Sequence, residues 1–510
     1  MLKWVWILSI CLVGCTRNPV TGKTEWQLVS ESQEISLGEE NYHFMQQAQG
    51  GDYVTDPTLQ RYIANVGSKL AAVSDRPHLP YEFVILNNSI PNAWALPGGK
   101  IAINRGLLIE LHSEAELAAV LAHEIVHSAA RHGAKAIERG VLMEAGLLGL
   151  EQLLKDHSYG SLLLDTSTIG SALIGLRYSR EAELEADCYG IKYMVLAGYD
   201  PSAAISLQKT FLKLSEGATH SPFDVWFSTH PPSEDRVLAN EATSATYPPG
   251  GFLGIQEYAE ATERLHQDIP AYEKLDKGWN ALDNGNPYKA ERLAIEAIAI
   301  EPNEALFYDL QGRAQKTLKK KEEALLSFDR AIELNPTYFD FYLQRGLLEK
   351  EDKAYVLAKL DLEKSISLLP SAEAYYALGE IAQAEGRSQD ALKYFQIASK
   401  APSSAGNRAK NAYTAIDLPL HPNQYITTHS SWNAKKQMRL HMTNQSPCYV
   451  HVLEIEVTFL DAKKQGIGKK IIDTSETIPP YGTVDLSSNL HAPKNTAYVQ
   501  AHILRVRIIS

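Results

Sequence analysis

The spacing of apolar residues predicts three kinds of region along the chain. From about residue 31 to residue 265, apolar side chains recur mostly every three or four positions, which is the period of an amphipathic helix. Two apolar runs between residues 81 and 108 are instead typical of short strands. From about residue 420 the period falls to two, as in LEIEVTF, where Leu453 and Ile455 are expected to face the same side. We therefore expect a mainly helical chain that ends in a small β-sandwich.

Residues 113–133 form the strongest helix prediction. Ser113 and Glu116 make an S-x-x-E capping box at the start of this segment, and Gly133 is its expected end. Further helical patterns follow, but Pro231-Pro232 interrupts them. The residue before these prolines, His230, is therefore expected in a loop.

Residues 270–405 carry an internal repeat. Pro302, Pro336 and Pro370 are each 34 residues apart, and three series of small residues keep the same period. A 34-residue period with small residues at helix contacts and a proline after the second helix is the tetratricopeptide signature. We expect a solenoid of about four helix pairs. The series are Gly278, Gly312 and Gly346; Ala290, Ala324 and Ala358; and Ala297, Ala331 and Ser365.

Composition narrows the functional classes. A chain of 510 residues is too long for one core, so several domains are expected. The formal net charge is −12 and there is no Lys/Arg block, which argues against nucleic-acid binding.

The first 14 residues are typical of a targeting segment. Lys3 precedes an apolar run that is too short to span a bilayer, and Leu-Val-Gly-Cys closes the run at Cys15. This end resembles a bacterial lipoprotein signal, in which the cysteine carries the lipid. The alternative is a plain secretory signal with an incidental cysteine. Thr16, rather than Asp, follows the cysteine, which favours sorting to an outer membrane where the host has one.

Two cysteines remain in the expected mature chain, Cys188 and Cys448. They could pair in an oxidising compartment, but they fall in different predicted domains, which favours two separate thiols.

The segment AVLAHEIVHSAARHG contains the main chemical motif. His123 and His127 are four residues apart on the predicted helix, so both rings lie on one face and could share a tetrahedral Zn²⁺. Glu124 lies beside them, where it could take a proton from bound water. The alternative is a helix with two surface histidines. Continuing the helix places His132 about 140° from the ligand face, which indicates a structural role.

The segment YSREAELEADCYG contains a candidate third ligand. Glu183 and Asp187 are four residues apart on a predicted helix. Glu183 could complete a His₂Glu site, and Asp187 could accept the free N–H of a ligand histidine. The alternative is a charged helix face that also holds Glu181 and Glu185.

Four motifs together resemble one protein family. NAWALPGGKIAINRGLL, HEIVH, SREAELEAD and THPPSEDR occur in this order, as in the zinc endopeptidases that include HtpX-type heat-shock proteases and CaaX prenyl endopeptidases. A following tetratricopeptide array resembles the periplasmic, BepA-type branch. The resemblance implies a gluzincin-type α+β metalloprotease domain over residues 15–265. It also implies that Glu183, the first acid of the E-x-x-x-D motif, is the third ligand. The β-sandwich at 420–510 shows no such likeness.

The family resemblance also implies a mechanism. One Zn²⁺ per chain, held by His123, His127 and Glu183, would activate a water whose proton Glu124 accepts. A strand beside the cleft would pair with an extended peptide through main-chain hydrogen bonds. The alternative interpretation is that this segment is a core strand without a role in peptide binding. Its residues are Asn92, Ala93, Trp94, Ala95 and Leu96.

His230 raises the question of control. Its imidazole could take the fourth zinc position and act as a latch, or stabilise the oxyanion during catalysis. It could also be a loop histidine away from the metal.

The sequence thus favours a lipid-anchored zinc endopeptidase that faces the periplasm, on the outer membrane, and cleaves misfolded or misassembled envelope proteins. The repeats would bind clients or envelope assembly machinery. A chaperone or adaptor that works through the repeats, with its zinc site latched by His230, is the alternative. A structural lipoprotein with an incidental HExxH motif is disfavoured by the four ordered motifs.

Overall fold

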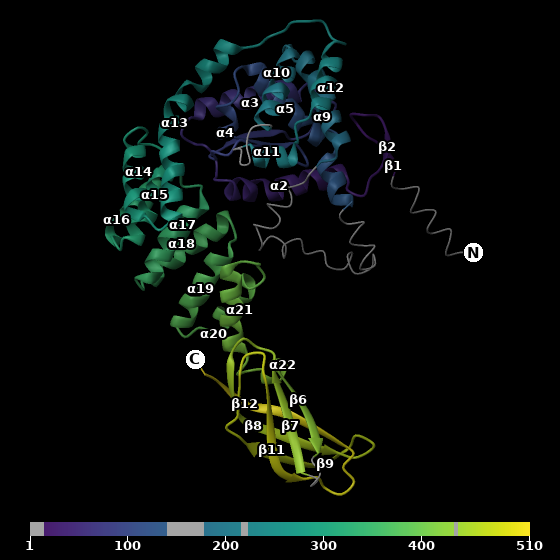
Figure 1. Ribbon diagram of the computed structural model, residues 1–510, viewed down its shortest axis with the longest axis vertical. Helices are drawn as coiled ribbons and strands as arrows, with labels where there is room; N and C mark the ends of the chain where they lie inside the picture. The colour runs from purple at the N-terminus through teal and green to yellow at the C-terminus, as the bar shows by residue number, and fades with distance from the viewer. Residues whose placement is uncertain (1–14, 140–177, 216–222, 433–436, 510) are drawn as a thin grey trace, which may run out of the picture. The chain divides into compact units, whose positions relative to one another are not determined.

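The computed structural model describes residues 15–139, 178–215, 223–432 and 437–509 (Figure 1). The chain divides into two compact units, residues 1–370 and 371–510. The expected signal peptide, residues 1–14, lies outside the described residues. Within the described parts of the chain, no helix is both long and apolar enough to cross a membrane.

The N-terminal part of the first unit contains a three-stranded sheet. The strands are β3 (Glu82–Leu86), β4 (Ala93–Leu96) and β5 (Lys100–Asn104), in the order β3-β5-β4. β3 and β5 are parallel, whereas β4 is antiparallel to β5. The turn between β4 and β5 needs glycine, since Gly98 and Gly99 have φ angles of 80° and 90°. The predicted strands and their turn are confirmed.

Helix α5 (Glu114–Ala129) lies at the centre of this part and is buried along its length. Ser113 caps it by accepting a hydrogen bond from the Glu116 backbone N–H, as predicted. The helix ends before Gly133, because Arg131 adopts a left-handed conformation with φ of 63°. This early end changes where the following residues lie.

Further helices surround α5 (Figure 1). Helix α9 packs directly against α5. The lack of a side chain at Gly190 allows this close approach, since a Cβ there would lie 3.3 Å from the backbone nitrogen of His123. The helices are α2 (Glu31–Ala48), α3 (Pro57–Ala71), α4 (Arg105–Leu108), α9 (Arg180–Leu196), α10 (Ser202–Ser215), α11 (Asp224–Thr229) and α12 (Glu234–Ser244). A short hairpin, β1 (Cys15–Arg17) with β2 (Thr24–Trp26), precedes them.

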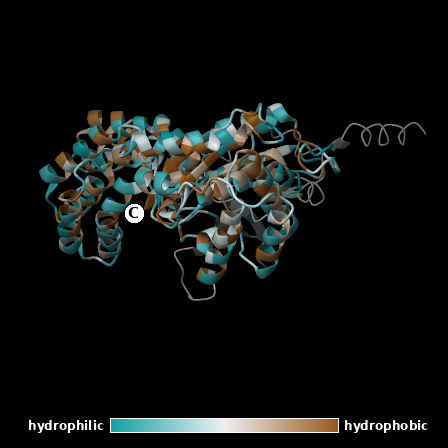
Figure 2. Cartoon of the chain, turned by 90° about the horizontal axis from the view of Figure 1, so that it is seen from above, coloured by the Kyte–Doolittle hydropathy of each residue, from teal (hydrophilic) through white to brown (hydrophobic). Residues whose placement is uncertain are grey.

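Helix pairs confirm the predicted repeats. The small residues lie at helix contacts: a Cβ at Gly312 would lie 2.7 Å from the Phe328 ring, and one at Gly379 would lie 2.4 Å from the Phe395 ring. Hydrophobic and hydrophilic residues alternate around these helices (Figure 2). The first unit holds α13 (Ile255–Asp283), α14 (Pro287–Ile298), α15 (Ala305–Thr317), α16 (Lys321–Leu334), α17 (Phe339–Glu351) and α18 (Tyr355–Leu368). The second unit holds α19 (Ala372–Ala384), α20 (Ser388–Ala398), α21 (Ser404–Asp417) and α22 (Pro422–Tyr425).

Within the first unit, a buried carboxylate joins the repeats to the N-terminal part. Glu304 precedes α15, and its side chain accepts hydrogen bonds from Thr55 Oγ1 at 2.8 Å and Asn87 Nδ2 at 3.0 Å. The hydroxyl of Tyr272, on α13, donates to the same carboxylate at 2.6 Å. A second contact is bidentate: the Gln47 amide donates to the Thr337 carbonyl and accepts from the Phe339 backbone N–H. These bonds hold the two parts of the unit together.

The second unit ends in the predicted β-sandwich. One sheet has the order β11-β7-β6, and in the other β8 pairs with β9, β10 and β12. Both sheets contribute to one hydrophobic core, with Leu440 and Met442 from the first and Val457 from the second. The strands are β6 (Ile426–Trp432), β7 (Gln437–Asn444), β8 (Tyr449–Leu460), β9 (Gly466–Asp473), β10 (Thr477–Ile478), β11 (Thr483–His491) and β12 (Tyr498–Ile509).

One residue of the sandwich departs from the predicted alternation. Ile455 and Val457 are buried as expected, but Leu453 is only half-buried and Val452 takes the core position instead. The pairing of β12 with β8 shifts register next to Arg505, which changes the face that Leu453 presents.

Candidate metal centre

Four side chains converge beside α5. One ligand atom from each of His123, His127, Glu183 and His230 lies within 4.8 Å of all the others, and all four residues are buried. The Nε2 atoms of His123 and His127 are 3.0 Å apart. Glu183 Oε1 is 3.5 Å from His127 Nε2, and its Oε2 is 3.5 Å from His123 Nε2. His230 Nδ1 lies 3.1 Å from Glu183 Oε1.

Three elements bring these side chains together. The two α5 histidines share one face because they are four residues apart. Ser179 caps α9 by accepting a hydrogen bond from the Ala182 backbone N–H, which fixes the first turn that carries Glu183. His230 ends α11, and its ring centre lies 4.4 Å from that of Trp226. The predicted loop at Pro231-Pro232 therefore turns the His230 ring towards α5 and α9.

The outer nitrogen of His123 has a fixed partner. His123 Nδ1 lies 2.9 Å from Asp187 Oδ1, and a carboxylate only accepts, so Nδ1 carries the hydrogen. Arg236 orients this carboxylate with two hydrogen bonds of 2.7 Å, and its Nη1 lies 3.1 Å from Glu183. Asp187 thus lies where the sequence predicted it. Arg236 falls within the THPPSEDR motif, but spacing alone assigned it no partner.

His132 does not lie where the helix extrapolation put it. The prediction that it points away from the ligand face is wrong in its geometry, because α5 ends at Ala129 and Arg131 turns the chain. His132 Nδ1 lies 2.9 Å from His127 Nδ1, on the outer side of that ring. The ring of Tyr178 stacks on His127 with centres 3.9 Å apart, a contact that no sequence motif indicates.

The charges inside the cluster compensate one another. Burial alone would lower the pKa of His123, but the carboxylates of Asp187 and Glu183 raise it to about 10. Burial holds the pKa of His127 well below its usual range, so this ring is neutral. Burial would raise the pKa of Glu183, yet the neighbouring histidines, His230 first, keep it well below the ordinary value. A proton on His123 therefore neutralises the carboxylate when no metal is bound.

The donor set fits a zinc ion. The Nε2 atoms of His123 and His127 face each other at 3.0 Å, so either a hydrogen on one of them or a bound metal ion must separate their lone pairs. Imidazole nitrogen and carboxylate oxygen are ordinary Zn²⁺ ligands, and two histidines with one glutamate form a known catalytic set. In this cluster a metal ion would replace the proton on His123.

Glu124 lies beside the cluster but is not one of its four possible metal ligands. It is fully buried, and neither carboxylate oxygen has a hydrogen-bond partner among the described residues. Its Oε1 lies 3.6 Å from His230 Nε2. Burial raises the pKa of Glu124, which makes its carboxylate a better proton acceptor. A buried carboxylate that accepts no hydrogen bond is costly to stability, which makes Glu124 a candidate for a chemical role.

Strand β4 contains four of the five predicted substrate-strand residues, and it is an edge of the sheet. Trp94 and Leu96 are buried, as the core-strand alternative expected, and Trp94 packs edge-on against Tyr42 at 6.1 Å between ring centres. Ser128, on α5, donates to the Leu96 carbonyl at 3.1 Å. The strand thus lies next to the metal-site helix, but its side chains belong to the core.

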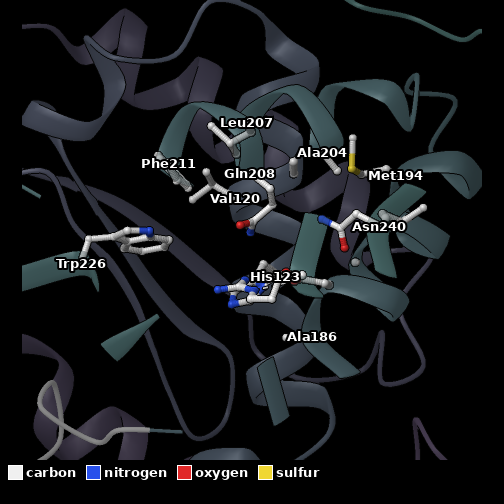
Figure 3. A pocket seen from close by; sticks show the side chains of 15 residues that line it. Val120, His123, Ala186, Met194, Ala204, Leu207, Gln208, Phe211, Trp226 and Asn240 are labelled. Carbon is white, nitrogen blue, oxygen red and sulfur yellow. Dashed lines mark hydrogen bonds and ion pairs between the residues drawn. The ribbon is translucent and has the colours of Figure 1, made fainter. Parts of the chain in front are cut away.

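A small cavity lies on one side of the cluster (Figure 3). His123, Gln208, Trp226 and Asn240 contribute to its lining, and its volume of about 30 Å³ is the space of a single water molecule. It is therefore too small to hold a peptide.

Two cysteines of the described residues are free thiols. Cys188 is exposed and Cys448 is half-buried.

Comparisons with known proteins agree with the cluster. Residues 57–243 match Peptidase family M48. The putative beta-barrel assembly-enhancing protease of Vibrio cholerae is 29% identical over 281 residues, which cover 53% of this chain and 56% of that protein. The mitochondrial metalloendopeptidase OMA1 of Arabidopsis thaliana is 30% identical over 208 residues, or 41% of each chain. Among solved structures, the crystal structure of MamA aligns with 28% of this chain and 84% of its own at 27% identity and a TM-score of 0.24.

The helix-borne HExxH residues, the acid from α9 and the M48 match define a metallopeptidase domain. Residues 57–243 thus resemble peptidase family M48, and the proteins similar to this chain include one named a putative beta-barrel assembly-enhancing protease. The aligned segments span about half the length of the two relatives described.

Proposed function

We propose that the chain is a zinc-dependent endopeptidase of the periplasm that cleaves misfolded or misassembled envelope proteins. The observation that carries this proposal is the convergence of His123, His127 and Glu183 beside a buried Glu124, which has no hydrogen-bond partner within the part of the chain that the structure describes. The names of the relatives, a beta-barrel assembly-enhancing protease and a metalloendopeptidase, support it.

The proposed roles follow from the positions of the donor atoms. His123, His127 and Glu183 would hold one zinc ion, which supplies Lewis-acid polarisation of the water and of the peptide carbonyl. Glu124 would accept the proton of the attacking water and pass it to the leaving amine. Asp187 holds the hydrogen on His123 Nδ1, so that Nε2 of this ring can face the metal.

Substrate binding is proposed at β4. An extended peptide would add to this edge strand through main-chain hydrogen bonds, which select weakly among sequences. Asn92, Ala93, Trp94, Ala95 and Leu96 would form the floor of that site. Their buried side chains fit such a role, since only the backbone need contact the peptide.

The other regions have supporting roles in this proposal. Lipidation of Cys15, after removal of residues 1–14, would anchor residues 15–265, the protease, to the outer membrane. The repeats at 270–405 would bind clients or assembly machinery, and the sandwich at 420–510 would act as a spacer or interaction module. Client specificity would then come from the repeats.

The metal and the activity can be tested together. We expect the purified chain to hold one zinc ion and to cleave an unfolded protein in a chelator-sensitive way. In cells, Glu124→Gln should leave its clients uncleaved while the protein accumulates normally. Full envelope function and normal client levels in that variant would contradict the protease proposal.

The position of His230 favours a second candidate function. Its Nδ1 lies 3.1 Å from Glu183 and 3.3 Å from His123 Nε2, where it would occupy a fourth metal position. A protein latched in this way could act mainly as a chaperone or adaptor through its repeats. His230→Ala distinguishes the roles, since a latch predicts faster cleavage and an oxyanion role predicts a sharp loss.

A further inference from the structure

The two histidines of α5 contact different partners on the outer side of their rings. His123 Nδ1 meets a carboxylate, Asp187, whereas His127 Nδ1 meets another imidazole, His132, at 2.9 Å. Resting on the proposed zinc site, we propose that His132 is a positioning residue that fixes the tautomer of His127 and thereby raises the affinity of the site for zinc.

Glu185 contacts His132 on the side opposite His127, and this contact sets the direction of both hydrogen bonds. Burial lowers the pKa of His132, which favours its neutral ring. Glu185 Oε2 lies 3.4 Å from His132 Nε2, and a carboxylate only accepts, so the neutral ring carries its hydrogen on Nε2. Its Nδ1 is then an acceptor. The hydrogen between the two rings must therefore belong to His127 Nδ1, which leaves a lone pair on His127 Nε2.

That lone pair points into the cluster. His127 Nε2 lies 3.0 Å from His123 Nε2 and 3.5 Å from Glu183. The other tautomer would put a hydrogen on His127 Nε2, where it would block a metal ion. His132 thus performs for His127 the task that Asp187 performs for His123.

The position of His132 is fixed by the backbone and by a buried ion pair. Arg131 is 4% exposed and holds a left-handed conformation. Its guanidinium pairs with Glu34 of α2 and donates to the Val29 carbonyl at 2.6 Å. These contacts hold the turn that returns His132 to α5.

One helix supplies both outer carboxylates. Glu183 faces the cluster, Asp187 contacts His123 directly, and Glu185 contacts His132, the partner of His127. Lys23 Nζ contacts the second oxygen of Glu185 at 2.6 Å and orients it. This arrangement accounts for Glu185, which in the sequence looked like part of a charged surface.

Paired variants of His132 test this inference in the full-length protein. Asparagine places an oxygen where the His132 Nδ1 acceptor lies, whereas leucine removes the acceptor at similar volume. We expect His132→Leu to weaken zinc affinity roughly 10- to 100-fold, and His132→Asn to stay within about 3-fold of the wild type. Competition with a zinc-chelating indicator measures both values.

A milder variant alters Glu185, the last residue in the hydrogen-bonded series that runs from His127 through His132. Glu185→Gln should weaken zinc affinity by less than His132→Leu, and Glu181→Gln, an exposed position on the same helix, should leave it unchanged. Thermal melting of each metal-free variant separates loss of affinity from loss of the fold.

A spectroscopic signature completes the test. In zinc-loaded wild type, ¹⁵N correlations of His127 should show hydrogen on Nδ1. Equal zinc affinity in His132→Leu and wild type, or hydrogen on His127 Nε2, would overturn the inference and leave the protease proposal intact. A wild-type protein that binds no zinc would overturn both.

Discussion

Helices α5 and α16 bury residues of very different character. They have 16 and 14 residues, and both lie in the first unit. α5 is buried on all sides and includes His123, Glu124 and His127 among its buried residues. α16 buries one stripe, with Ala324 and Phe328 at its centre, and exposes the rest.

This difference separates two uses of burial. In α16 the buried side chains are apolar or small, so each contact stabilises the fold. In α5 the buried ionisable groups cost free energy unless they are paired, and neither oxygen of Glu124 accepts a hydrogen bond from the described residues. The comparison teaches that burial in α16 serves stability, whereas burial in α5 also encloses ionisable groups that cost stability. Substitutions in the two helices should therefore affect different properties.

The largest expected effect is on catalysis, in Glu124→Gln. Loss of the proton acceptor should lower the cleavage rate by about 10²- to 10⁴-fold. The melting temperature of the metal-free variant at pH 8 should not fall, because the raised pKa of Glu124 means that its ionised form is disfavoured in the fold. Cleavage of an unfolded substrate and calorimetry measure the two effects. A melting temperature of Glu124→Gln far below that of the wild type would contradict the proposed difference between α5 and α16.

The second prediction concerns stability rather than catalysis: Phe328→Ala should strongly lower the free energy of unfolding. This side chain is fully buried and contacts Gly312 of the preceding helix, so its loss should cost roughly 3–5 kcal/mol. Leu326→Ala, on the same helix but 68% exposed, is the matched control and should change stability by less than about 0.5 kcal/mol. Chemical denaturation of the full chain compares them. Similar losses in both variants would contradict the packing described here.

A smaller effect is expected from Asp187→Ala. Without this carboxylate, His123 loses the partner that fixes its Nδ1–H, and Arg236 loses both of its 2.7 Å bonds. Zinc affinity should fall about 10- to 100-fold. Titration with a chelating indicator measures the change, and unchanged affinity would show that the outer hydrogen bond is dispensable.

The smallest effect concerns the repeats and sharpens the comparison. One carboxylate oxygen of Glu349, on α17, has no hydrogen-bond partner in the described ranges, and burial raises the pKa of this side chain to about 7. A raised pKa in the fold means that the ionised form destabilises it, so this penalty is present above about pH 7 and disappears as the pH falls towards 4.5. Glu349→Gln should thus stabilise the protein at pH 8 by at most about 2 kcal/mol and have no effect near pH 4.5. Equal gains at both pH values would rule out titration as the cause.

Much of this organisation could be predicted from local patterns. The Ser113 cap, the Gly98-Gly99 turn and the spacing of His123 and His127 depend on neighbouring residues, so sequence suffices for them. The repeat could be predicted because its small residues recur at a fixed period, and each lies at a contact that a larger residue would block.

The errors arise where distant contacts override a local pattern. His132 was placed wrongly because extending a helix ignores the left-handed turn at Arg131, which Glu34 stabilises from 97 residues away. Leu453 was assigned to the core because strict alternation ignores a register shift set by β12. The stacking of Tyr178 on His127 likewise depends on how α5 and α9 pack, which the sequence does not encode locally.

The carboxylate of Glu304 has a consequence for how cleavage sites would be chosen. Its bonds to Thr55 and Asn87 join the first repeats to the sheet that carries β4, so within this unit the two surfaces cannot drift apart freely. If a client protein bound along these repeats, only the part of the client that lies at a fixed distance from its bound segment would reach the metal site. The unit would then behave as a molecular ruler, and bonds would be cut according to their distance from the docked segment rather than their side chains.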